Sequence, residues 1–194
     1  YGGNTKLPFS EDDPVDHPVS LYAATKRADE LIAHTYTSLY GIQTIGLRFF
    51  TVYGPWGRPD MAMWIFTDKI RRGEKIQVYN YGRMQRDFTY IDDIVDGILN
   101  ARSADHLQPY EIFNLGNSRT ENLMDLIAEI ERAVGRKAEM EMMPIQPGDV
   151  PKTYADIAKA KRELGFAPTT PIRVGVPRFV EWFNAYHNEE STHG

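Results

Sequence analysis

The amino-acid sequence predicts an α/β fold, and two observations lead to that prediction. Short apolar segments typical of buried strands alternate with longer segments whose apolar residues recur at helical spacing. Glycine, proline and aspartate residues separate these segments at the places where turns are expected. No internal repeat or low-complexity segment interrupts the alternation.

The first third of the chain is expected to contain two helices and one strand. Residues 20–40 show the helical spacing of apolar residues, and Gly41 follows at the position where helices commonly end. Residues 43–54 form an apolar run typical of a mostly buried strand. After a loop rich in proline and glycine, a second helix is expected over about residues 61–72, ending at Gly73.

The rest of the chain continues the alternation. Asp92 and Asp93 lie in the first turn of one expected helix, where carboxylates favour the positive end of the helix dipole, so we do not interpret them as metal ligands. Thr120 is expected to cap the next helix and Gly135 to end it. The expected elements are short strands at 75–80 and 85–90 around a Tyr81–Gly82 turn, a helix at 91–102, a strand at 110–116, a helix at 120–135, a strand at 138–145, and helices at 155–166 and 171–188.

Composition excludes several classes of function. The net charge is −5, from 22 basic and 27 acidic residues, and no basic stripe appears, which argues against a nucleic-acid partner. The chain has no cysteine, which excludes disulfides, thiolate catalysis and cysteine-based zinc sites. Its five histidines lack metal-ligand spacing, so no metal site is expected. No apolar run approaches the roughly 18 residues of a membrane span, and no signal peptide opens the chain, so we expect a cytoplasmic protein without membrane contact.

The two ends of the sequence carry expectations of their own. The chain begins abruptly, without methionine, in a segment that resembles the end of a strand, so we expect it to be the C-terminal part of a longer protein. No G-x-G-x-x-G turn follows any expected strand, so the phosphate cradle of a dinucleotide would lie upstream of Tyr1. The short polar segment 189–194 is expected to be a disordered tail.

The segment "SLYAATKRADEL", residues 20–31, contains two candidate catalytic residues. Tyr22 and Lys26 are four residues apart, so a helix presents the phenol and the ammonium on one face. Two alanines and a threonine between them leave room for a ligand close to that face. A phenol has a pKa near 10 and is a poor base at neutral pH, but a cation one turn away favours the phenolate. An aromatic–lysine pair is also common on ordinary amphipathic helices, so this spacing alone is weak evidence for a catalytic role.

The order of the other motifs is more specific than the Tyr22–Lys26 spacing. After Tyr-x-x-x-Lys come "LRFFTVYGP", "RDFTYIDD", "FNLG" and "PGDVPKTYAD". This series resembles the extended short-chain dehydrogenase/reductase family, and more closely its NAD-dependent nucleotide-sugar epimerases and dehydratases. "RPDM" at residues 58–61, just after "YGPWG", is similar to the 4-epimerases that act on UDP-glucuronic acid. The resemblance runs from Tyr1 to about Phe183 and covers about the last three-fifths of such an enzyme.

The resemblance implies an isomerase of polysaccharide biosynthesis that interconverts UDP-glucuronate and UDP-galacturonate through a 4-keto intermediate. In this scheme Tyr22 takes the proton of the 4-hydroxyl while C4 gives its hydride to NAD⁺, and hydride returns to the opposite face after the sugar has turned. Lys26 lowers the pKa of Tyr22 and holds the nicotinamide ribose. Phe49 lies beside the nicotinamide carboxamide, although a buried strand aromatic explains it equally well.

Two residues are expected to contact the hexose. Thr51 occupies a position where UDP-galactose 4-epimerases carry an asparagine that touches the sugar. Arg58 lies between a glycine and a proline in a loop, where it has little structural reason to be. Its planar guanidinium can bind both oxygens of a sugar carboxylate.

Four residues are expected along the nucleotide. Val78 and Tyr79 resemble the strand whose backbone and side chains hold uracil, and Arg86 resembles the arginine that binds the diphosphate. Asp149 resembles the acid that contacts the ribose, although Pro-Gly-Asp is also an ordinary turn sequence. Gln146 departs from the basic residue found three positions before this acid in UDP-galactose 4-epimerases, which weakens a galactose assignment.

The expected organisation has two parts. Residues 1–56 are assigned to the end of a doubly wound, Rossmann-type dinucleotide-binding domain, and residues 57–188 mainly to a smaller α/β lobe that binds the nucleotide sugar. One strand and helix, at about 84–102, are expected to return to the main sheet. The full-length enzyme is expected to form a homodimer through a helix bundle that includes the Tyr22 helix.

Three alternatives remain at this stage. A nucleotide-sugar 4,6-dehydratase or a UDP-glucuronate decarboxylase would share the oxidation at C4, and a dehydratase would need an Asp-Glu pair just before Tyr1. A non-catalytic fragment would bind the nucleotide sugar without turning it over. Because the chain lacks the glycine-rich cradle, we expect these 194 residues alone to be inactive.

Overall fold

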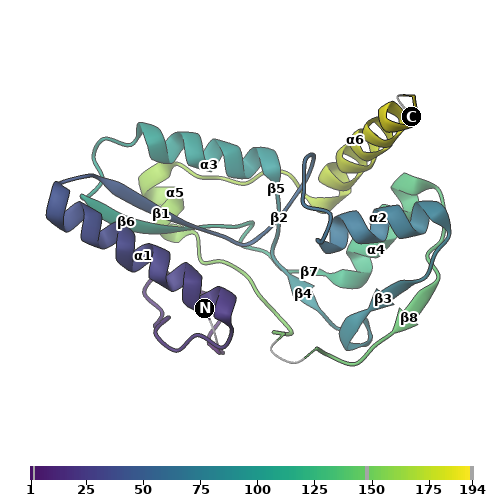
Figure 1. Ribbon diagram of the computed structural model, residues 1–194, viewed down its shortest axis with the longest axis horizontal. Helices are drawn as coiled ribbons and strands as arrows, with labels where there is room; N and C mark the ends of the chain where they lie inside the picture. Colours follow the sequence, from purple (N-terminus) through teal and green to yellow (C-terminus); the bar gives the residue numbers. More distant parts are fainter. Residues whose placement is uncertain (2, 147–148, 193–194) are drawn as a thin grey trace.

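The fold has two hydrophobic cores, and the elements around them form the two groups visible in the computed structural model (Figure 1). The structure describes residues 1, 3–146 and 149–192, with side chains as far as residue 188. The first group contains α1 (Leu21–Tyr40), β1 (Thr44–Phe49), α3 (Ile91–Ser103), β6 (Tyr110–Leu115) and α5 (Ala158–Leu164). The second contains α2 (Ala62–Arg72), β3 (Ile76–Val78), β4 (Gln85–Arg86), β7 (Glu121–Asn122), α4 (Leu123–Val134), β8 (Met140–Met142) and α6 (Ile172–Thr192).

Parallel strand pairs connect the elements, which confirms the predicted α/β class. Strand β1 pairs in parallel with β6, and β3 pairs in parallel with β8. Between the two groups, β2 (Thr51–Tyr53) pairs in parallel with β5 (Phe88–Tyr90). Only the short β4–β7 ladder is antiparallel among the strands that the structure describes.

The first core lies between the β1–β6 ladder and the helices α3 and α5. Phe113 and Leu115 of β6 are fully buried there against Phe166, which follows α5. Helix α1 lies on the other side of β1 from α3 (Figure 1). None of its residues is buried, so polar contacts and half-buried side chains must hold it against the sheet.

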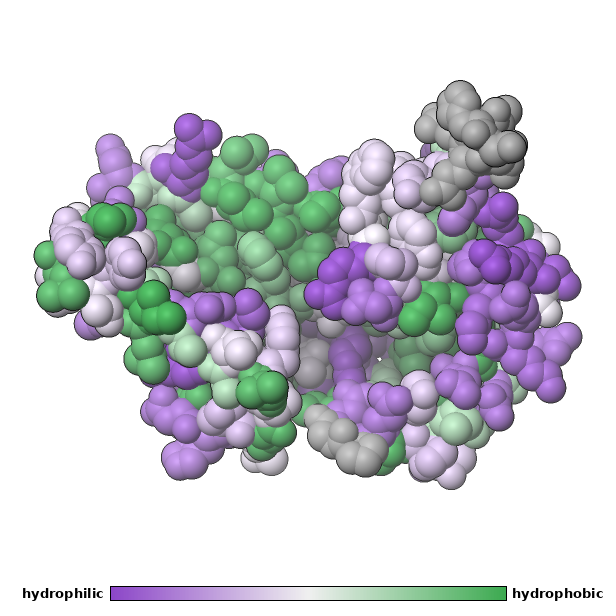
Figure 2. All heavy atoms as spheres, viewed as in Figure 1, coloured by the Kyte–Doolittle hydropathy of each residue, from purple (hydrophilic) through white to green (hydrophobic). Residues whose placement is uncertain are grey.

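The outer face of α3 is also apolar. Val95, Ile98 and Leu99 of this helix are exposed, and Figure 2 shows a broad hydrophobic area over α3. The second core, unlike the first, is covered by three helices, α2, α4 and α6, which pack around fully or nearly fully buried side chains. These side chains include Ile70, Ile127, Ile130, Phe179 and Phe183.

The expected strand at 43–54 is two strands with different partners. The backbone changes partner at Phe50, whose N–H donates to Leu115 O at 3.2 Å, while the next N–H, of Thr51, donates to Asp87 O at 3.1 Å. The strands expected at 75–80 and 85–90 likewise do not pair with each other. Asn80 and Tyr81 between them adopt left-handed backbone angles, with φ of 50° and 52°, in a 3-10 turn (η1, Tyr79–Gly82) that leads the chain away from β3.

Three helix boundaries differ from expectation. Thr120 does not cap α4, because residues 121–122 first pair with β4, and Asn122 takes the N-cap position. Helix α5 begins at Ala158 and not at 155, since Ala155 forms a β-bridge with Phe9. Helix α6 continues to Thr192, into the segment expected to be a tail from 189, and residues 193–194 lie outside the described residues. No helix in the described ranges has the length and hydropathy of a membrane span.

Candidate active site

The first turns of α1 present Tyr22 and Lys26 on one side, as their spacing predicts. The Oγ of Ser20 caps the helix by accepting the N–H of Ala23 at 3.1 Å. The Lys26 ammonium lies 5.9 Å from the centre of the Tyr22 ring. Tyr22 is 69% exposed, so its hydroxyl is open to a ligand.

Asp29, which sequence reasoning missed, holds Lys26 one turn further along α1. The carboxylate lies 3.0 Å from the Lys26 Nζ, and this hydrogen bond raises the pKa of Lys26. Lys26 therefore keeps its positive charge beside the phenol, in an ion pair that is open to solvent. The signal for Asp29 was available in the sequence, because positions three apart on a helix are neighbours.

A cavity of about 820 Å³ opens beside this face of α1. Tyr22, Lys26, Phe49 and Thr51 all line it, so the structure brings together the two expected catalytic residues, an expected cofactor residue and an expected sugar residue. Phe49 is half exposed and projects from the end of β1. The expected alternative, a buried strand aromatic, does not apply to Phe49.

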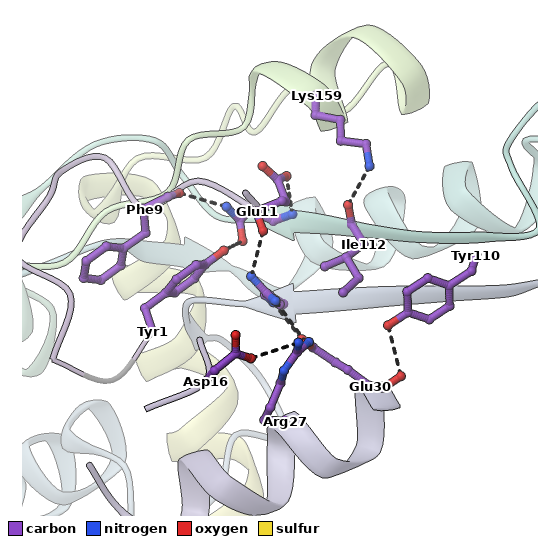
Figure 3. Close-up of polar contacts among 11 residues, drawn as sticks. Tyr1, Phe9, Glu11, Asp16, Arg27, Glu30, Tyr110, Ile112 and Lys159 are labelled. Atoms are coloured by element: carbon purple, nitrogen blue, oxygen red, sulfur yellow. Dashed lines mark hydrogen bonds and ion pairs between the residues drawn. The ribbon is translucent and has the colours of Figure 1, made fainter. Parts of the chain in front are cut away.

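An ion-pair network in the cavity wall joins α1 to β1. Glu30 accepts two hydrogen bonds from Arg48, at 2.7 Å from Nε and 3.0 Å from Nη2, and one from Arg27 at 2.9 Å. The Tyr110 hydroxyl donates to the backbone oxygen of Glu30 at 3.0 Å. In Figure 3, Arg27 and Glu30 extend from the helix, and the Tyr110 hydroxyl points to the backbone of Glu30. The network therefore fixes the helix that carries Tyr22.

A second tyrosine lines the cavity but has a different environment. The Tyr1 hydroxyl, visible in Figure 3, donates to Asn114 Oδ1, and the Arg48 guanidinium lies 5.0 Å from the centre of the Tyr1 ring. Burial raises the pKa of the Tyr1 phenol to about 12, against the opposing effect of Arg48. Glu11 completes this cluster by accepting the N–H of Asn114 at 2.7 Å. Tyr1 is thus a half-buried hydrogen-bond donor and is unsuited to act as a base.

Arg86 and Asp149, assigned separately to the diphosphate and the ribose, form an ion pair. Arg86 Nη2 lies 2.5 Å from Asp149 Oδ1, although the residues are far apart in the sequence. Burial lowers the pKa of Arg86, and the neighbouring carboxylate of Asp149 partly offsets this effect. The next segment of chain supplies Val150 and Thr153 to the cavity wall. Neither Arg86 nor Asp149 lines the cavity itself, so the structure brings the two residues to each other and places them beside a segment of the cavity wall.

The expected uracil strand is only partly suited to its role. Val78 is fully buried in the second core, so the expectation that its side chain touches uracil is wrong, and its carbonyl accepts the N–H of Met143 at 2.9 Å. Tyr79 is half buried and donates its hydroxyl to Gln77 at 3.1 Å. Neither residue lines the cavity.

Arg58 lies in the loop between β2 and α2, outside the cavity lining but within electrostatic reach of Tyr22. Its Nε and Nη2 donate to both oxygens of Asp60, at 3.0 and 2.7 Å. These bonds raise the pKa of Arg58, and Tyr22 contributes a smaller effect in the same direction. Trp56 in the same loop contacts the Trp182 ring on α6, with centroids 5.4 Å apart.

Among the described residues, no group of three or more histidine, aspartate or glutamate residues could hold a metal ion.

A comparison with protein-family models identifies the family of the chain. The family model described as NAD dependent epimerase/dehydratase family matches residues 1–116, which include α1, β1 and the cavity-lining Thr51. The chain belongs to this family.

Individual relatives in the family carry more specific names. A UDP-glucuronate 4-epimerase of Arabidopsis thaliana is 48% identical over 207 residues, covering 97% of this chain and 47% of that protein. An uncharacterized protein of Methanocaldococcus jannaschii is 57% identical over 183 residues, covering 94% of this chain and 56% of that protein. The chain spans about half the length of these relatives.

Solved structures of the same family share the fold. The UDP-glucuronic acid 4-epimerase of Bacillus cereus, in complex with UDP-glucuronic acid and NAD, superimposes with a TM-score of 0.88 at 31% identity. That match covers 95% of this chain and 58% of the Bacillus protein. The epimerase fold of that enzyme therefore extends over nearly all of the chain.

Proposed function

We propose that this chain carries the catalytic tyrosine and the nucleotide-sugar site of an NAD-dependent 4-epimerase that acts on UDP-glucuronate. The observation that carries the proposal is the grouping of Tyr22, Lys26, Phe49 and Thr51 around one cavity. The relatives named UDP-glucuronate 4-epimerase favour epimerisation over the dehydratase and decarboxylase alternatives.

The chemistry assigned to the chain's own side chains follows from their surroundings. The exposed Tyr22 hydroxyl takes the proton of the sugar 4-hydroxyl and later returns it, and the positive charge of Lys26 stabilises the phenolate in between. Thr51 offers a hydroxyl to the hexose. Arg58 binds the sugar carboxylate in a two-bond contact, for which it must release Asp60.

The residues present fit one end of NAD. Lys26 and the half-exposed Phe49 ring border open space beside Tyr22, where the nicotinamide ribose and its carboxamide would be held. Bound NAD supplies the oxidising and reducing power for C4. The sequence offers no glycine-rich turn for the pyrophosphate, so the remaining contacts must come from residues other than these 194.

The exposed apolar side chains of α1 support a homodimer of the full-length enzyme. Leu31, Ile32, Leu39 and Tyr40 are all exposed on this helix, and a second helix packed on them would remove that surface from water. Sedimentation analysis of the full-length protein, with Leu39→Lys as the variant, tests this assignment. We expect the variant to sediment as a monomer.

The test of the substrate assignment compares kcat/KM for UDP-glucuronate and UDP-glucose in the full-length protein. A carboxylate at C6 can accept two bonds from Arg58, whereas a hydroxymethyl group leaves guanidinium donors unpaired, which costs roughly 1–3 kcal/mol. We expect a preference for UDP-glucuronate of about one to two orders of magnitude. Arg58→Ala should remove most of it, and Arg58→Lys should keep part, because an ammonium lacks the planar fork.

Arg72→Ala is the matched control. Arg72 is also an exposed arginine paired with a nearby aspartate, Asp68, but on α2. Its removal should leave the preference unchanged. A wild-type preference for UDP-glucose, or an unchanged ratio in Arg58→Ala, would overturn the uronic-acid assignment.

A further inference from the structure

Asp87 is a fully buried carboxylate that the chemistry described above does not use. Asp87 lies between Arg86 and the first residue of β5, and it is 0% exposed. A buried carboxylate without partners would cost several kcal/mol, so its partners indicate what it holds in place.

The Asp87 side chain connects three separate segments of the chain. Oδ1 accepts the N–H of Asn117 at 2.6 Å and the Thr89 hydroxyl at 2.9 Å. Oδ2 accepts the N–H of Ser118 at 3.1 Å and that of Ala155 at 3.0 Å. Successive backbone N–H groups such as those of residues 117 and 118 form a concave anion site, which the carboxylate fills.

One of these segments leads to Asp149. Residues 151–155 run beside residues 85–87, because Gln85 N donates to Pro151 O at 2.8 Å and Thr153 N donates to Gln85 O at 3.1 Å. The Asp87–Ala155 bond continues this row of contacts. The segment that begins at Asp149 is therefore fixed along the strand that carries Arg86.

The backbone of Asp87 reaches the hexose end of the candidate site. Its carbonyl accepts the N–H of Thr51 at 3.1 Å. Gly116 leaves the space that the carboxylate needs, since a Cβ there would lie 2.9 Å from Asp87 Oδ2 and 2.7 Å from the Ala155 Cβ. One residue thus touches the segments that carry Thr51, Arg86 and Asp149.

We propose that Asp87 is a positioning residue that sets the spacing between the hexose contact at Thr51 and the nucleotide contacts at Arg86 and Asp149. The inference rests on the function proposed above. In that reaction the hexose turns over while the nucleotide stays bound, so the anchors must keep their separation through the turn. A misplacement of about 1 Å in such a site reduces rates by up to about a hundredfold.

The experiment uses Asp87→Asn in the full-length protein, with calorimetric titration of UDP and of NAD and steady-state kinetics with UDP-glucuronate. The amide keeps the size of the carboxylate but presents an NH₂ group to donors that need an acceptor. We expect UDP affinity to fall about tenfold or more, as for a lost hydrogen bond to a charged group. KM should rise with it, while NAD affinity stays unchanged.

Asp93→Asn is the matched control. Asp93 is also a nearly buried carboxylate that accepts backbone N–H groups, from Thr169 at 3.1 Å and Thr170 at 3.0 Å, but it fixes the segment before α6. We expect it to lower stability without changing UDP affinity. Thr89→Val, which removes one hydrogen bond from Asp87 and leaves its charge, should weaken UDP binding in the same direction by a smaller factor.

The outcomes separate this inference from the proposed function. If wild-type protein binds UDP and Asp87→Asn binds it equally well, or if both aspartate variants lose UDP affinity together, Asp87 is only structural and the inference is wrong. If Asp87→Asn does not fold, an unchanged UDP affinity in Thr89→Val has the same consequence. Failure of the wild-type protein to bind UDP or UDP-glucuronate overturns the proposed function itself.

Discussion

Glu30→Gln tests whether the ion-pair network holds the catalytic helix in place. Helix α1 has no buried residue, so its attachment to β1 depends strongly on the contact of Glu30 with Arg48, while Arg27 binds Glu30 within the helix. Glutamine has the same shape but keeps a single acceptor oxygen and no charge. The variant therefore removes part of the attachment without removing side-chain volume.

The structure limits the size of the effect. The side chains of Glu30 and Arg48 are 16% and 15% exposed, so the pair is neither fully buried nor open to solvent. Breaking a buried pair costs about 3–5 kcal/mol, and an exposed pair contributes about 0.2–1 kcal/mol. At least one charge-assisted hydrogen bond, with a contribution of about 1.5–3 kcal/mol, is lost. We expect the free energy of unfolding to fall by about 2–3 kcal/mol at neutral pH.

The pH dependence gives a second measurement. Burial raises the pKa of Glu30, but the hydrogen bonds from Arg48 and Arg27 outweigh it, so the net pKa is lowered. A lowered pKa in the folded state means that the stabilisation is complete above the unfolded pKa, near 4.3, and disappears as the pH falls through the folded pKa. The difference between wild type and Glu30→Gln should therefore shrink in acid.

Urea unfolding followed by circular dichroism measures both quantities. Asp68→Asn is the control, because its partner Arg72 is 59% exposed and the expected loss is below about 0.5 kcal/mol. A loss in Glu30→Gln no larger than that of the control, or one that does not depend on pH, would refute the reasoning.

Three further outcomes are expected. Tyr22→Phe in the full-length protein should lower turnover at least about a hundredfold while leaving unfolding unchanged, because the side chain is exposed; a residual rate above about a tenth contradicts its role as the base. Gly97→Ala should lower the free energy of unfolding by about 1–3 kcal/mol in urea titrations, since its Cβ would lie 2.8 Å from the Phe166 ring and 2.9 Å from Leu115; unchanged stability contradicts this packing. The 194 residues alone should show no NAD binding in calorimetry, and a low-micromolar dissociation constant would contradict the absence of a pyrophosphate site.

The ends of three helices were predictable from the sequence because a glycine next to the helix determines each of them. Gly41, Gly73 and Gly135 follow α1, α2 and α4 as expected, with φ of 66°, 76° and 76°. Strand partners were not predictable in this way. Whether β3 pairs with β4 or with β8 depends on how distant segments pack, and local composition is compatible with both.

The candidate site shows the same division. The Tyr22–Lys26 relation is fixed by helical spacing, so the sequence alone predicts it. The Glu30–Arg48 pair joins a helix to a strand and was missed, although a charged residue in an otherwise apolar strand was a usable signal. Asp87 was passed over for the adjacent Arg86, because a carboxylate that binds backbone N–H groups leaves no pattern in side-chain types.

The strand pairing has a consequence for how the protein is made. Within the described residues, every strand ladder joins distant parts of the chain, and even the nearest partners, Arg86 and Glu121, are 35 residues apart. Strand β3 must wait for β8, 64 residues later, before its backbone is paired. During synthesis each early strand therefore leaves the ribosome before its partner among the described strands, and helices α1 and α2 can form before any of these ladders closes. Folding of this chain is expected to be slow, to finish only when α5 and α6 have followed β8 and closed the two cores, and to be sensitive to aggregation until then.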